Sequence, residues 1–263
     1  MRKIIKDYLA KEYDNYVKDL ETLTNIDSGN GDLEGTTEAN KFVAAKMEAL
    51  GAETEFRYND RACHLISRLK GKGTQTVLLV AHVDTVFKRG EAAKRPFCVD
   101  ENGFAWGPGV GDDKATVMEV IYGLQALKEA GFDDYNEIIY YTNGEEEGGS
   151  PTAEGIVAEL SQQADFAVII DVARPNWGIV TQRKGNAKYK ITVTGKGGHH
   201  GNASQCCANA IHQLAYTITE LHKLASPMPG NPEDFTAKAL EERGITDSGQ
   251  FIPPNTVNVG VIG

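Results

Sequence analysis

Cysteine, long apolar runs and an excess of basic charge are scarce or missing in this sequence of 263 residues. No apolar segment approaches the roughly 20 residues that a membrane-spanning helix needs. The 4 cysteines include the adjacent pair Cys206 and Cys207, and they lack the spacing of a structural zinc site. We therefore expect reduced thiols, a cytoplasmic setting and no membrane association. Residues 1–7 start with basic side chains but lead into no apolar core, so we do not expect a signal peptide.

The charge balance argues against a further class of partner. The 27 basic residues are outnumbered by 37 acidic ones, which gives a formal net charge of −10. An acidic protein is repelled by nucleic acids and by anionic membranes, so we expect neither as a partner. The length allows one large or two modest domains.

Helical and strand-like segments alternate through the first two thirds of the chain. Apolar spacing predicts helices at residues 4–23, 37–50 and 115–130, and strands at 64–69, 76–81, 137–142 and 166–170. This alternation predicts an α/β fold, with a mixed, mostly parallel sheet flanked by helices. We place a boundary near residues 181–185, which gives domains at 1–182 and 183–263. The second domain is predicted to contain a strand at 189–194, a helix at 203–225, a stretch rich in Pro and Gly at 226–254, and a strand at 256–262.

The most informative stretch is the one that ends the apolar run at residues 76–81. His82 and Asp84 follow that run, and side chains two positions apart on a strand point to the same face. Both side chains can therefore meet at the carboxyl edge of a sheet, where open α/β folds bind their ligands.

Three further acidic sites follow. Asp112 and Asp113 precede a predicted helix, residues 145–147 are three glutamates after a predicted strand, and Asp171 ends another strand. Imidazole and carboxylate ligands without thiolate suit a catalytic zinc or another divalent metal of the first transition row. A carboxylate that bridges two such ions would form the site of a two-metal hydrolase.

The motifs around these residues resemble a family of zinc exopeptidases and deacylases. The family includes glutamate carboxypeptidase, acetylornithine deacetylase, succinyl-diaminopimelate desuccinylase and peptidase T. The glutamate carboxypeptidase branch is the most similar, through the sequences at residues 82–87, 95–97 and 107–109. The resemblance implies hydrolysis of a peptide or amide bond, with a small peptide or N-acyl amino acid as substrate. It also implies two Zn²⁺ ions per complete site, with Co²⁺ or Mn²⁺ as substitutes.

The resemblance also implies roles for single residues. His82 and Asp171 match ligands of one metal, and Asp112 matches the bridging carboxylate. Asp84 matches the carboxylate that orients the metal-bound imidazole. The glutamates at 145–147 allow two registers; we take the later one, because Glu-Glu, one residue, then Gly-Ser fits the family motif. In that register Glu146 matches the general base and Glu147 a ligand of the second metal.

The second domain matches part of an inserted α+β dimerisation, or lid, domain. The resemblance implies a homodimer in which His199 reaches the partner's active site and helps to hold the substrate carboxylate and the developing oxyanion. Family members continue for about another hundred residues, about one domain's worth of chain, and carry a last histidine ligand there. We therefore expect the lid domain to be incomplete here, with the first metal bound well, the second bound poorly, and little activity from this chain alone.

Several other interpretations remain open. Asp171 matches the aminopeptidase branches, where carboxypeptidases and deacylases carry Glu, so an aminopeptidase and an N-acyl amino-acid deacylase are alternatives. Asp112 and Asp113 could cap a helix, and residues 145–147 could be a solvated turn. His199 could be an exposed loop residue. Outside catalysis, the chain could be a truncated, inactive fragment, or a phosphate-binding module built on the glycine-rich loops at 71–74 and 107–111.

Overall fold

The computed structural model describes residues 1–172, 185–202, 207–224 and 256–261. The chain divides into two compact units, Met1–Gly178 and Ile179–Gly263. The predicted stretch at 226–254 and the boundary residues 181–184 lie outside the described residues. None of the described helices combines the length and the apolar character needed to cross a membrane.

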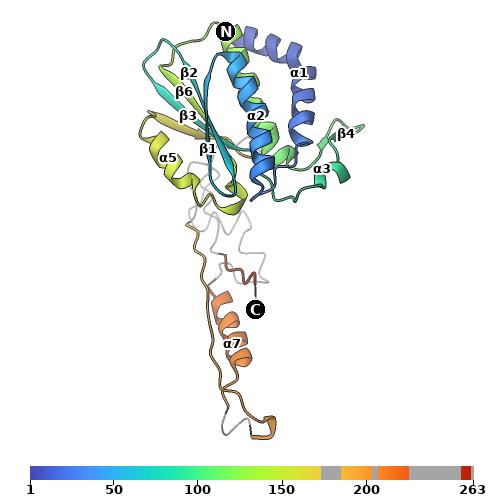
Figure 1. Cartoon of the computed structure of the whole chain (residues 1–263), viewed down its shortest axis with the longest axis vertical. Coiled ribbons are helices and arrows are strands. Elements are labelled where there is room, and N and C mark those ends of the chain that lie inside the picture. The colour runs from blue at the N-terminus through green and yellow to red at the C-terminus, as the bar shows by residue number, and fades with distance from the viewer. Residues whose placement is uncertain (173–184, 203–206, 225–255, 262–263) are drawn as a thin grey trace, which may run out of the picture. The chain divides into compact units, whose positions relative to one another are not determined.

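The first unit is built on a five-stranded sheet with the order β1-β2-β6-β3-β7 (Figure 1). The strands are β1 (Glu53–Tyr58), β2 (Cys63–Lys70), β3 (Thr76–His82), β6 (Glu137–Asn143) and β7 (Phe166–Ile169). β2 pairs antiparallel with both β1 and β6, whereas β3 pairs parallel with β6 and β7. The predicted mixed sheet is thus confirmed, but within the described residues it is not mostly parallel, because two of its pairings are parallel and two are antiparallel.

The three parallel strands bring their carboxyl ends to one edge of the sheet. His82 at the end of β3 lies opposite Asn143 at the end of β6. Val80 of β3 lies opposite Ile169, the last residue of β7. The loops that leave these strands therefore start side by side, which is the arrangement that the strand-end residues predicted.

Three helices cover one face of the sheet: α1 (Arg2–Thr24), α2 (Leu33–Leu50) and α4 (Ala115–Glu129). Their apolar sides form a buried core with one set of alternate strand residues, including Leu65, Ile138 and Tyr140. The opposite set packs against α5 (Ala153–Ser161) in a smaller core, in which Ile139 and Tyr141 meet Leu160. The strands are apolar on both faces because helices bury both faces.

Several short elements of the first unit lie between β3 and α4. They are the short helix α3 (Glu91–Lys94), the hairpin of β4 (Cys98–Val99) and β5 (Ala105–Trp106), and the turn η1 (Val110–Lys114). The turn η2 (Glu146–Gly148) follows β6. The turns η1 and η2 carry acidic residues singled out in the sequence, so both bear on the site.

The second unit contains the short turn η4 (His200–Asn202) and the helix α7 (Ala210–His222). The side chain of Asn209 caps α7 by accepting a hydrogen bond from the His212 N–H. The predicted helix was therefore right in kind but began too early. No ladder forms at 189–194 or at 256–261 within the described residues; Lys196 forms a single bridge with Ala208 instead. The predicted strands at 189–194 and 256–262 are therefore wrong for the described residues, since a strand needs a neighbour for its backbone groups.

Candidate metal centre

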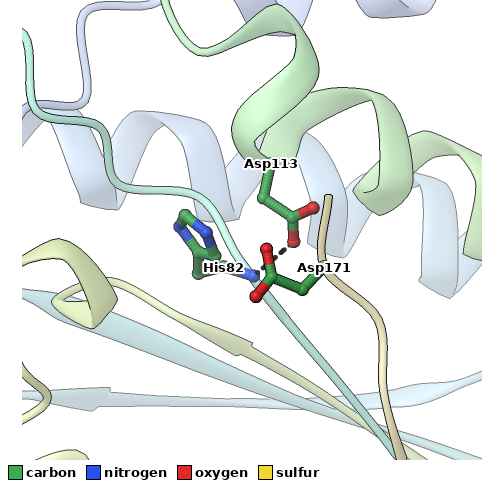
Figure 2. Close-up of side chains that lie close together, drawn as sticks. All are labelled: His82, Asp113 and Asp171. Atoms are coloured by element: carbon green, nitrogen blue, oxygen red, sulfur yellow. Dashed lines mark hydrogen bonds between the residues drawn. The ribbon is translucent and has the colours of Figure 1, made fainter. Parts of the chain in front are cut away.

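Three side chains from separate segments converge at the carboxyl edge of the sheet (Figure 2). His82, Asp113 and Asp171 each offer one ligand atom, and these atoms lie within 4.8 Å of one another. His82 ends β3, Asp113 lies in η1 and Asp171 follows β7. The fold thus gathers one imidazole and two carboxylates from positions as far apart as 82 and 171.

His82 is buried, with 3% of its surface exposed. Its Nδ1 lies 3.1 Å from the backbone oxygen of Asp84, and its Nε2 lies 3.0 Å from Oδ1 of Asp112. Burial disfavours the charged ring, but the hydrogen bond to Asp84 and the charges of Asp113, Asp84 and Glu146 outweigh it and raise the pKa of His82 to about 10. In that protonated form both ring nitrogens donate, and a metal ion would have to replace the Nε2 proton.

Asp84 is fully buried and joins His82 to the glutamate loop. Its Oδ1 accepts a hydrogen bond from the Glu146 N–H at 2.9 Å and lies 3.5 Å from Nδ1 of His82. Its Oδ2 accepts from the Glu147 N–H and from Nδ2 of Asn30, each at 3.0 Å. Such a carboxylate fixes the orientation of a metal-binding imidazole.

The adjacent residues Asp112 and Asp113, which a cis peptide bond joins, occupy different environments. The Asp112 side chain is 56% exposed, with its Oδ1 facing Nε2 of His82. Asp113 is fully buried; its Oδ2 accepts from the His82 N–H at 3.2 Å, and its Oδ1 accepts from the Thr116 hydroxyl. Both carboxylate oxygens of Asp113 thus accept hydrogen bonds inside the protein. We therefore favour Asp112 as the metal ligand, although Asp113 lies in the cluster with His82 and Asp171. The sequence motifs assign no role to Asp113.

The three consecutive glutamates also differ. Glu145 is buried, and its carboxylate accepts hydrogen bonds from the Thr152 N–H and hydroxyl, from the Ala153 N–H and from Asn59. These bonds occupy Glu145 at the start of α5. Glu146 is exposed and Glu147 is half-buried, and their backbone N–H groups point to Asp84. This geometry favours the later register.

Carboxylates crowd this edge of the sheet. Burial raises the pKa of Asp113 to about 7. Partial burial, together with the negative charges of Asp84, Asp171 and Asp112, raises the pKa of Glu146 despite the opposing charge of His82. Burial and the charge of Asp112 raise the pKa of Glu147 as well. A divalent cation would relieve this repulsion, and hard oxygen ligands with one imidazole fit a catalytic zinc.

The alternative interpretations of these residues gain less support. The first residues of α4 receive no side-chain cap from Lys114, the residue at its N-cap position, and Asp113 accepts from His82 instead. The glutamate loop is not merely solvated, because Glu145 is buried within hydrogen-bonding distance of α5. The glycine-rich loop at 107–111 follows the two-residue strand β5 and leads into η1, which carries the two aspartates.

His199 lies in the second unit. Its ring centroid is 4.5 Å from that of His200, and its Nδ1 accepts a hydrogen bond from the Gly201 N–H at 3.2 Å. Both histidines are exposed. The position of His199 relative to the metal ligands of the first unit stays a prediction.

Comparison with known proteins identifies relatives with longer chains. Carboxypeptidase G2 from Pseudomonas sp. (strain RS-16) is 34% identical over 200 residues, which cover 74% of this chain and 48% of the relative. Acetylornithine deacetylase from Aliivibrio salmonicida is 27% identical over 196 residues, which cover 73% of this chain and 50% of the relative. The chain thus spans about half the length of these curated relatives.

Solved structures show the same fold. A tripeptidase from Staphylococcus aureus superposes with a TM-score of 0.59 at 22% identity, covering 78% of this chain and 55% of the other. The profile of Peptidase family M20/M25/M40 matches residues 78–245, which include every proposed metal ligand. The chain therefore belongs to Peptidase family M20/M25/M40.

Proposed function

We propose that this chain forms the metal-binding part of a zinc-dependent hydrolase that cleaves a peptide or amide bond, of the glutamate carboxypeptidase type. The observation that carries the proposal is the convergence of His82, Asp113 and Asp171 at the sheet edge, with Asp112 3.0 Å from His82. The 34% identity to carboxypeptidase G2 supports this type of activity.

The proposed ligands divide between two ions. His82 and Asp171 would bind the first ion, Asp112 would bridge both, and Glu147 would bind the second. Three protein ligands are enough for a catalytic zinc, so the first ion can be held by this chain alone. Co²⁺ or Mn²⁺ would substitute for zinc, because these ions accept the same nitrogen and oxygen ligands.

Bound there, the metal would supply Lewis-acid polarisation of the scissile carbonyl and would lower the pKa of a water molecule. Glu146 would act as the general base: its carboxylate would take the proton of the attacking water and pass it to the leaving amine. Asp84 would keep the His82 ring in place.

The substrate class is the finer part of the proposal. A C-terminal glutamyl peptide fits the relationship to carboxypeptidase G2, and an N-acyl amino acid fits the relationship to acetylornithine deacetylase. Asp171 favours a third candidate, an aminopeptidase, because the resemblance places Asp at this position in aminopeptidase branches. We propose the carboxypeptidase, since several flanking motifs outweigh one carboxylate.

The second unit would act as the lid and dimerisation domain. In a homodimer, His199 of one protomer would enter the active site of the other and donate a hydrogen bond to the developing oxyanion. The exposed position of His199 in the glycine-rich turn is compatible with this role.

The substitution Glu146→Gln tests the proposed reaction. The variant should keep the zinc content of the wild-type protein and lose turnover, because glutamine has the same shape but cannot accept the proton. Glu154→Gln in the first turn of α5 is the matched control and should keep both properties. Turnover is measured on a panel of C-terminal glutamyl peptides, N-acyl amino acids and tripeptides with a free amine. Persistent turnover in Glu146→Gln would refute the assignment of the base, and absence of turnover by the zinc-loaded wild-type protein on the whole panel would refute the proposed reaction.

A further inference from the structure

The connector between α1 and α2, residues 26–30, contacts the loop that carries His82 and Asp84. The Ser28 hydroxyl donates to the Val83 carbonyl at 2.6 Å, and the Thr85 N–H donates to the Ser28 carbonyl at 2.9 Å. The Asn30 N–H donates to the Thr85 carbonyl at 2.8 Å, so the connector and the loop run parallel as a short bridge. The backbone of residues 83–85, which contains Asp84, is thus held by hydrogen bonds that it both donates to and accepts from the connector.

The same connector contacts the glutamate loop through Asn30. Its Nδ2 donates to Oδ2 of Asp84 at 3.0 Å, and the N–H groups of Glu146 and Glu147 donate to the same carboxylate. A Cβ added at Gly148 would lie 2.7 Å from the Asn30 amide, so the turn after Glu147 rests on Asn30. Asn30 therefore fixes the carboxylate on which the glutamate loop depends.

The connector also contacts η1 through its other end. Lys114, which follows Asp112 and Asp113, is 1% exposed, and its Nζ donates to the Ile26 carbonyl at 2.7 Å. A buried ammonium needs such an acceptor, so breaking this contact would leave a costly unpaired charge. The loop after β3, the turn η1 and the glutamate loop after β6 thus all contact the connector 26–30.

We propose that the connector 26–30 positions three of the four ligand loops relative to one another, namely those that carry His82, Asp112 and Glu147, and that Asn30 is its main positioning residue. This inference rests on the proposed function for the identity of the ligands. Asn30 acts through Asp84: its side-chain amide restrains the carboxylate that orients His82 and that also accepts hydrogen bonds from the N–H groups of Glu146 and Glu147. Loss of the Asn30 amide would let the carboxylate turn and would loosen two ligand loops together.

The test compares Asn30→Ala with a matched control, Asn136→Ala. Asn136 likewise donates one amide hydrogen bond, to the Thr76 hydroxyl at 2.9 Å, but at the amino ends of β3 and β6. Amide hydrogen exchange in the metal-free protein is measured by NMR at Glu146 and Glu147, and zinc affinity is measured by competition with a chromogenic chelator. Asn30→Ala should speed exchange at both amides and weaken zinc binding about 10- to 100-fold, as losses of such supporting contacts do. Asn136→Ala should change neither.

A second variant keeps the test decisive if Asn30→Ala does not fold. Asn30→Asp has the same size but places a carboxylate against Asp84, so it should give the same two effects. Unchanged exchange at Glu146 and Glu147 in the folded variants, or an equal change in Asn136→Ala, would overturn the positioning role. Failure of the wild-type protein to bind zinc would instead refute the proposed function, while the exchange measurement would still decide the role of Asn30.

Discussion

Asp112 and Asp113 are neighbours in the sequence, yet their surroundings assign them to different tasks. The Asp112 side chain is exposed to solvent and faces Nε2 of His82. Asp113 is buried and accepts hydrogen bonds from the His82 N–H and the Thr116 hydroxyl. The first arrangement leaves oxygens available for a metal, and the second stabilises the loop that presents it. A substitution of Asp112 should therefore affect mainly zinc binding, and a substitution of Asp113 mainly stability.

Removing the two carboxylates one at a time should separate these roles. Asp112→Ala should weaken zinc binding at least tenfold and change the free energy of unfolding by less than about 0.5 kcal/mol, because its side chain is exposed. Asp113→Ala should cost about 1–3 kcal/mol of unfolding free energy, because it leaves buried donors unpaired. Zinc titration and urea unfolding of the metal-free variants measure both effects. A larger loss of zinc affinity in Asp113→Ala than in Asp112→Ala would reverse the assignment.

The sequence identified the site to the level of segments, and buried hydrogen bonds decided the rest. The strand ends predicted that His82, Asp84 and Asp171 lie at one edge of the sheet, because parallel strands align their carboxyl ends, whereas their proposed roles came from the family resemblance. The task of Asp113 and the contact of Asn30 with Asp84 depend on side-chain partners that are distant in the sequence. No spacing rule indicates such partners, so residue-level roles required the structure.

At the scale of elements, the start of α2 carries a pH-dependent contact. Asp32 is the N-cap of α2; it accepts from the Gly35 N–H at 3.0 Å and pairs with Arg89 through both carboxylate oxygens. Burial works to raise the pKa of Asp32, but the hydrogen bond and charge of Arg89 and the capped N–H groups lower it overall. Arg89 belongs to the segment after β3, so the contact ties that segment to α2.

The contribution of Asp32 should therefore depend on pH in a defined direction. The pKa of Asp32 is lower in the folded protein than in the unfolded chain. The stabilisation by the Asp32 carboxylate is therefore fully present above the unfolded-state pKa of about 3.9 and is lost as the pH falls through the folded-state pKa. Asp32→Ala should cost about 0.5–2 kcal/mol of unfolding free energy at pH 7, and the difference should shrink below about pH 4. Urea unfolding across pH measures this. Asp32→Asn, which keeps a capping side chain, should lose less; a cost of Asp32→Ala that does not vary with pH would contradict the pairing.

The start of α5 depends on Glu145. Glu145→Ala would leave the N–H groups of Thr152 and Ala153 without their acceptor and should lower the free energy of unfolding by about 1–3 kcal/mol. Thermal and urea unfolding of the metal-free protein check this value. Glu147→Ala should change stability by less than about 0.5 kcal/mol and weaken binding of the second metal ion. The reverse pattern would restore the earlier register of the glutamates.

Most elements of the first unit could be predicted because their apolar residues recur at the period of a helix or a strand. The prediction failed where tertiary partners decide the outcome. β1 was not foreseen, since its residues alternate between exposed and half-buried, none is fully buried, and it exists as the antiparallel partner of β2. α2 begins at Leu33 rather than at 37 because Asp32 caps it there.

At the scale of the molecule, all proposed metal ligands lie in the unit Met1–Gly178, and His199 lies in the unit Ile179–Gly263. The proposed division of labour gives the first unit the metals and the base, and gives the second unit the contact with a partner protomer. The two functions can be removed separately, because no residue serves in both.

Mixing two inactive variants tests that division. His199→Ala should bind zinc normally and lose about 100- to 1000-fold in turnover, the usual cost of an oxyanion donor. When the His199→Ala protein is mixed with the Glu146→Gln protein, the mixture should regain activity. A mixed dimer then holds one active site with an intact Glu146 and the partner's intact histidine. Turnover of the mixture is compared with that of each variant alone. No recovery under conditions where the protomers exchange would contradict a role for His199 across the dimer.

The central claim is that the edge of the sheet at His82 binds a divalent metal. Anomalous diffraction at the zinc edge, from crystals of the zinc-loaded protein, tests it most directly. The account predicts a peak about 2.0–2.2 Å from Nε2 of His82 and from carboxylate oxygens of Asp112 and Asp171. The absence of a peak at His82 in zinc-saturated crystals would contradict it, whether or not zinc binds elsewhere.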